Sequence, residues 1–77
     1  MNIKLNIMEI NNRYVVFKDS YFDSYILYSN NNYDKVIAWS IEFAESYSEF
    51  HQCKVDIEHN FVKYCTYING EFKNEKH

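Results

Sequence analysis

The longest regular alternation of apolar and polar residues in the chain runs from Asn32 to Phe50. At about 100° per residue, its apolar side chains share one broad arc and its acidic side chains lie opposite, which predicts an amphipathic helix. Asn32 is a good N-cap, and Asp34 in the first turn suits the positive end of the helix dipole. The apolar arc contains Tyr33, Val36, Ile37, Trp39, Ile41, Phe43, Ala44, Tyr47 and Phe50. We expect this arc to cover one face of a sheet, with Trp39 and Phe43 at its centre.

Shorter alternating or apolar stretches before the helix predict strands. Ile3–Ile10 alternates apolar and polar residues, and a slip in phase predicts a bulge near Ile7–Met8. The stretches Tyr14–Phe17 and Tyr25–Tyr28 are apolar on both faces, which is typical of further strands. Between the first two, Asn11–Asn12 can form a two-residue hairpin turn, because asparagine tolerates the positive φ that such turns need.

Two more strands are predicted after the helix. Cys53–Glu58 alternates regularly, as expected of a strand with one face in water, and Phe61–Ile68 is the next strand. The pair His59–Asn60 between them predicts a tight turn. Asn69–Gly70 is the strongest hairpin signal in the chain, and the short segment Glu71–Lys73 follows it.

This pattern predicts an α+β fold of the order β-β-β-α-β-β. We expect an antiparallel sheet of five strands, or six if the last short segment pairs, with one helix on one face. The chain has 77 residues, which is enough for one domain. We expect that domain to cover residues 1–73 and residues 74–77 to form a disordered tail. The hairpin turns predict neighbouring strands, but they leave the order of the whole sheet open.

Composition narrows the classes of function. The net charge is −3 and the basic residues are scattered singly, so direct nucleic-acid binding through a basic stripe is disfavoured. The N-terminus alternates polar and apolar residues instead of carrying the apolar run of a signal peptide, and no stretch approaches a membrane span. We therefore expect a cytoplasmic protein without a membrane partner, with Cys53 and Cys65 reduced.

Candidate catalytic and metal-binding residues have no supporting motif. His51, Cys53, His59 and Cys65 do not have the paired spacing of zinc ligands. Cys53 shares the apolar phase of its strand, which favours a core thiol, and a cross-strand disulfide with Cys65 stays open. We predict no catalytic, cofactor-binding or metal-binding residues, and an enzyme is the least supported class.

Two surfaces are candidates for binding a partner. The first is the polar side of the helix, where Glu42, Glu45 and Glu49 form one column of like charge and Asp34 adds a further carboxylate. These four residues, here called the acidic stripe, suit a basic partner surface, although an ordinary solvated face has the same pattern. The second candidate is a tyrosine-rich sheet face turned away from the helix, with core packing as the alternative. Its predicted contact residues are Tyr21, Phe22, Tyr25, Tyr28, Tyr64 and Tyr67.

The function that the sequence favours is non-enzymatic protein binding by occlusion of a partner's surface. In size and composition the chain is similar to the small inhibitors that bacteriophages and mobile elements carry against host defence, including anti-CRISPR proteins. That resemblance implies a protein partner in the cytoplasm of a host cell, and it carries over no residue. Two alternatives stay open: a small nucleic-acid-binding module that uses sheet aromatics, and a homodimeric accessory subunit.

Overall fold

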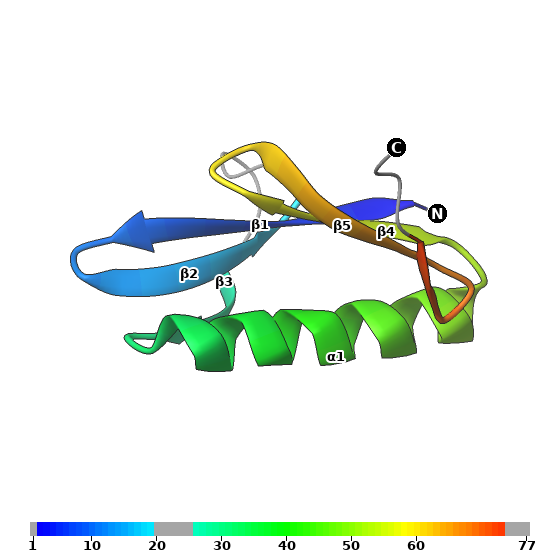
Figure 1. Ribbon diagram of the computed structural model, residues 1–77, viewed down its shortest axis with the longest axis horizontal. Helices are drawn as coiled ribbons and strands as arrows, with labels where there is room; N and C mark the ends of the chain where they lie inside the picture. The colour runs from blue at the N-terminus through cyan, green and yellow to red at the C-terminus, as the bar shows by residue number, and fades with distance from the viewer. Residues whose placement is uncertain (1, 20–25, 74–77) are drawn as a thin grey trace.

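A computed structural model describes residues 2–19 and 26–73 of the chain. In these residues one helix packs along one face of a six-stranded sheet (Figure 1). The elements are β1 (Ile3–Ile10), β2 (Arg13–Lys18), β3 (Ile26–Asn30), α1 (Tyr33–His51), β4 (Lys54–His59), β5 (Val62–Ile68) and β6 (Glu71–Lys73). The predicted α+β class, the helix and the short sixth strand are confirmed. The predicted tail, 74–77, lies outside the described residues.

The strand order is β3-β2-β1-β4-β5-β6, and the sheet is mixed. Four of the neighbouring pairs are antiparallel, but β1 and β4 pair in parallel at the centre. The prediction of a purely antiparallel sheet is therefore wrong for this pair. The reason is the helix: β3 runs in the direction of β1, and 19 helical residues then return the chain by about 28 Å. Consequently β4 starts at the same end of the sheet as β1, and a crossover of this length permits parallel pairing.

Two-residue turns join three of the four antiparallel pairs, and both residues of each turn have positive φ. They are Asn11–Asn12, Asn60–Phe61 and Asn69–Gly70. This combination defines the turn type that matches the twist of a hairpin, and asparagine is a preferred residue for it. The first and third turns confirm the prediction, whereas the middle turn lies one residue later than predicted. Its position is set by β1, because the Asn60 N–H donates to the Ile7 carbonyl at 3.0 Å.

The predicted bulge at Ile7–Met8 is wrong, since β1 pairs with β2 without a break there. The two bulges lie in the β2–β3 and β4–β5 pairs. One shifts the β2–β3 register between Val16 and Phe17, which leaves Leu27 as the extra residue. The other shifts the β4–β5 register after Ile57 and leaves Tyr64 as the extra residue. Each bulge places two consecutive side chains on the helix side of the sheet, and Leu27 accordingly packs against the core.

Small side chains, and not aromatic ones, bring α1 close to the sheet. Val36, Ser40, Ala44 and Ser48 recur at every fourth position and are all buried. Opposite them lie the central apolar residues of the sheet: Ile3, Leu5 and Ile7 of β1, Val16 of β2, and Val55 and Ile57 of β4. The two serine hydroxyls donate to helix carbonyls, so they are buried without an unpaired donor. The prediction that Trp39 and Phe43 occupy the centre of this contact is wrong, because both are only half-buried at its flank.

Both ends of α1 are capped. The Asn32 side chain accepts a hydrogen bond from the Lys35 backbone N–H at 3.2 Å, which confirms the predicted N-cap. At the other end Gln52 adopts the left-handed conformation, and its backbone N–H donates to the Ser48 carbonyl. The β5–β6 turn meets the helix here: a Cβ on Gly70 would lie 2.8 Å from Glu49 Cβ. Gly70 is thus required both by its φ of 86° and by this close approach.

Candidate interaction surface

The outer side of α1 carries the acidic stripe. Asp34, Glu42, Glu45 and Glu49 are all exposed, as predicted for the polar side of an amphipathic helix. None of the four forms an ion pair with another described residue; the ion pairs in these parts of the chain are Lys4–Glu58, Lys63–Asp56 and Lys73–Glu71. The stripe therefore presents uncompensated negative charge along the helix.

A row of stacked rings follows the flank of α1 nearest β3. Trp39, Phe43, Tyr47 and His51 succeed one another at intervals of four residues, with ring centroids 5.1, 5.5 and 4.2 Å apart. Tyr28 of β3 extends the row, since its ring lies 4.9 Å from that of Trp39 at an interplanar angle of 4°. We call Trp39, Phe43, Tyr47 and His51 the aromatic row. The stacking orders these side chains into one wall, whose first three rings are only half-buried.

Between the aromatic row and the acidic stripe, the helix surface has two shallow, open depressions, which we call the hollows. One hollow is lined by Trp39, Glu42, Phe43 and Ser46. The next is lined by Phe43, Ser46, Tyr47, Phe50 and His51. Phe50 is 83% exposed, more than any other large apolar side chain in the described residues. Sequence reasoning placed Phe50 in the core and overlooked Ser46; the available signal was a small residue with aromatic residues on both sides along the helix.

The predicted tyrosine-rich face turned away from the helix is not formed by its three described members, Tyr28, Tyr64 and Tyr67. Tyr28 lies against Trp39 on the helix side, and Tyr67 is only 7% exposed within the core. Tyr64 is 54% exposed, but the bulge places it on the helix side too, near Tyr33, whose pKa is raised first by burial and then by the neighbouring Tyr64. The register places Tyr28 opposite Val16 and Tyr67 opposite Val55, which are core residues of the helix side, and the bulge brings only Tyr64 to that side. Tyr21, Phe22 and Tyr25 lie outside the described residues.

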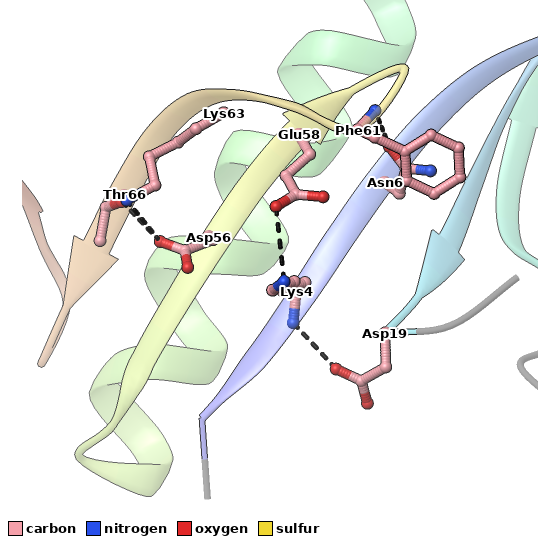
Figure 2. Close-up of polar contacts among 8 residues, drawn as sticks. All are labelled: Lys4, Asn6, Asp19, Asp56, Glu58, Phe61, Lys63 and Thr66. Carbon is pink, nitrogen blue, oxygen red and sulfur yellow. Dashed lines mark hydrogen bonds and ion pairs between the residues drawn. The ribbon is translucent and has the colours of Figure 1, made fainter.

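The sheet face away from the helix carries polar cross-strand contacts instead (Figure 2). Thr66 donates from its hydroxyl to the Asp56 carboxylate at 2.6 Å, and Lys63 Nζ lies 4.0 Å from the same oxygen atom. Lys4 Nζ lies 3.7 Å from a Glu58 carboxylate oxygen. Each of these carboxylates faces a lysine across the strands, so charge on this face is largely compensated. Asp56 and Thr66 are themselves buried, so the prediction that this side of β4 faces water is wrong at Asp56, and the contacts satisfy polar groups that folding removes from water.

Asn6 is a buried polar residue on the same face. Its Oδ1 accepts a hydrogen bond from the Phe61 backbone N–H at 3.1 Å, and Figure 2 shows the Phe61 ring beside it. Phe61 has a φ of 67°, which is uncommon for a bulky residue. Asn6 therefore holds the strained β4–β5 turn onto β1. Its Nδ2 has no hydrogen-bond partner among the described residues.

The cysteine and histidine residues are separated by the fold. Cys65 lies opposite Ile57, whereas the Cys53 carbonyl accepts from the Asn69 N–H, so the two thiols are about 13 Å apart along the strands. This distance excludes the disulfide that the sequence left open. Burial, with a smaller contribution from Asp56, raises the pKa of the Cys65 thiol and keeps it protonated at neutral pH. In residues 2–19 and 26–73, no group of three or more His, Cys, Asp and Glu side chains lies close enough to hold a metal ion.

The helix in the described part of the chain is too polar to cross a membrane. Comparison with protein-family models, with curated proteins and with solved structures gives no match.

Proposed function

We propose that this protein is a non-enzymatic binding protein that covers a basic surface of a partner protein with the outer side of α1. The observation that carries the proposal is the juxtaposition of two features on one helix. Glu42, Glu45 and Glu49 provide negative charge that no described residue compensates, and the aromatic row lies directly beside them. Charge complementarity accelerates association, and half-buried aromatic side chains are the usual anchors of a protein interface.

Occlusion is the mode of action that suits such a surface. A rigid helix on a sheet can block a partner's surface without a catalytic residue, and this is the mode implied for the small phage inhibitors to which the chain is similar in size and composition. The nucleic-acid alternative has less support from the described residues, because Lys4 and Lys63 on the open face are paired with carboxylates.

The test is capture of a partner by the tagged protein, with two variants of equal charge. The first variant carries Glu42→Lys and Glu49→Lys in the acidic stripe; the second carries Glu9→Lys and Glu71→Lys, which are also exposed but lie on strands. Circular dichroism first verifies that both variants are folded. We expect a partner retained by the wild type and by the strand variant but lost by the stripe variant. Equal retention by both variants would refute the role of the acidic stripe.

A further inference from the structure

The two hollows on α1 have the geometry of holes in a helix–helix interface. The residues that line the first, Trp39, Glu42, Phe43 and Ser46, are spaced i, i+3, i+4 and i+7. The second repeats these offsets one turn later in Phe43, Ser46, Tyr47 and Phe50, and His51 adds a fifth lining residue. When two helices pack, a side chain of one inserts into a hole made by four residues of the other. Two successive holes therefore form a groove that fits a second helix.

Two rows of side chains border the groove, and they differ in how far they project from the helix. Trp39, Phe43 and Tyr47 stack along one wall with centroid separations of 5.1 and 5.5 Å. The other wall follows the neighbouring row of the helix surface, where Ser46 is low and Phe50 stands 83% exposed at the end. Side chains four positions apart along a helix form ridges, and in the commonest class of helix packing these ridges of the two helices interdigitate. A partner side chain above Ser46 would thus meet Phe43 and Tyr47 on one flank and Phe50 one turn further along the helix.

Charge decides which helix can occupy the groove. Glu42 lines the first hollow, and Glu45 and Glu49 continue the acidic stripe along its outer side. A second copy of this chain in the groove would bring two such stripes together, and like charges across an interface oppose association. Lysine or arginine on the facing helix would instead pair with them.

We propose that the groove between the aromatic row and the acidic stripe receives a basic amphipathic α-helix of the partner protein. Two apolar side chains of that helix, one turn apart, enter the hollows on either side of Ser46, and its basic side chains face Glu42, Glu45 and Glu49. This inference rests on the proposed function, because it names the partner element that binds at the same surface.

The probe for the test is a lysine-rich peptide of 21 residues with leucine at positions a and d of three heptads. Lysine at positions e and g discourages the peptide from pairing with itself. A second peptide of the same composition has its leucines redistributed so that no apolar stripe forms. Trp39 is the only tryptophan and lines the first hollow, so its fluorescence reports occupation of the groove directly.

Ser46→Leu is the matched substitution, since it fills both hollows, and Ala38→Leu is its control. Ala38 is also exposed on α1 but lines neither hollow. We expect the helical peptide to shift Trp39 emission to shorter wavelength and to bind at least about tenfold tighter than the redistributed peptide. Ser46→Leu should weaken that binding about tenfold, whereas Ala38→Leu should leave it within about twofold.

Three results would overturn the inference. If the helical peptide fails to bind, or binds no better than the redistributed one, the partner element is not a helix. If Ser46→Leu binds as the wild type does, the groove is not used, although the acidic stripe can still dock a partner by charge. If the protein alone sediments as a dimer that Ser46→Leu dissociates, the groove holds a second copy. The proposed function fails separately, when Glu42→Lys with Glu49→Lys leaves partner capture unchanged.

Discussion

The hydroxyl oxygen of Ser48 accepts a hydrogen bond from the backbone N–H of Gly70 at 2.9 Å. This bond joins the last turn of α1 to the β5–β6 turn, and it does so between residues that are 22 positions apart. The same hydroxyl donates to the Glu45 carbonyl at 3.2 Å. Ser48 therefore both completes a helix contact and fixes the position of the outermost hairpin.

Replacing Ser48 by alanine should lower the free energy of unfolding by about 1–2 kcal/mol, because the partly buried Gly70 N–H loses its acceptor. Ser40→Ala is the control, since the Ser40 hydroxyl donates only to the Val36 carbonyl of its own helix. That change should stay within about 0.5 kcal/mol of the wild type. Urea unfolding followed by circular dichroism measures both. Equal losses in the two variants would contradict the role assigned to Ser48.

Gly70→Ala should destabilise the protein by about 1–3 kcal/mol. The added Cβ would meet Glu49 Cβ at 2.8 Å, and the residue would have to hold a φ of 86°. Glu71→Ala, one position later on an exposed strand residue, should cost less than about 0.5 kcal/mol. The midpoints of thermal unfolding separate the two cases. A Gly70→Ala variant as stable as Glu71→Ala would show that the turn has room to move away from the helix.

Asn6 and Asn2 each accept a backbone N–H from a residue far away in the sequence, but only Asn6 is buried. Asn6 is 1% exposed and accepts from Phe61, whereas Asn2 is exposed and accepts from Lys54 at 2.9 Å. We expect Asn6→Ala to cost about 1–3 kcal/mol, because the Phe61 N–H is left unpaired at a strained turn, and Asn2→Ala to cost under about 1 kcal/mol. Denaturant titration of the two variants checks the difference. Similar losses would mean that burial of Asn6 does not increase the contribution of its hydrogen bond to the free energy of unfolding.

Phe50→Ala should separate binding from stability. Phe50 is 83% exposed, so its removal should change the free energy of unfolding by less than about 0.5 kcal/mol. Val36→Ala, at a fully buried position of the same helix, should cost about 2 kcal/mol. If Phe50 anchors a partner, its alanine variant should lose capture while keeping the wild-type unfolding curve. A folded Phe50→Ala variant that captures the partner normally would remove Phe50 from the interface.

Alkaline pH should destabilise the fold. Burial raises the pKa of the Cys65 thiol, and burial also raises the pKa of the Tyr33 and Tyr67 hydroxyls. The unfolded chain loses these protons at lower pH than the folded one. The free energy of unfolding therefore keeps its full value below the ordinary pKa values and falls as pH rises above them. The fall should begin near pH 8.5 to 9, about where free cysteine ionises.

In Cys65→Ala the onset should move to about pH 10, where free tyrosine ionises. Urea unfolding at a series of pH values from neutral to alkaline measures the onset in both proteins. An unchanged onset in Cys65→Ala would show that Cys65 does not contribute to the alkaline loss of stability.

The local pattern of residues determined the helix and two of the turns. The spacing of apolar residues from Asn32 to Phe50 was sufficient to predict α1, its N-cap and its exposed acidic side. Asn11–Asn12 and Asn69–Gly70 predicted two of the turns, because asparagine and glycine tolerate the positive φ that these turns require. These features depend on neighbours within one helical turn or one hairpin, so the sequence contains all the information needed for them.

Tertiary structure decided the rest. The parallel pairing of β1 with β4 depends on where a helix of 19 residues returns the chain, which no local pattern encodes. The register of β3 and β5 turns Tyr28 and Tyr67 toward the helix, and a bulge adds Tyr64, so these three tyrosines of the described chain do not lie on the opposite face as expected. Which side of α1 touches the sheet was likewise a packing result: small residues permit the closest approach, and Trp39, Phe43 and Phe50 were left to shape the groove beside the acidic stripe.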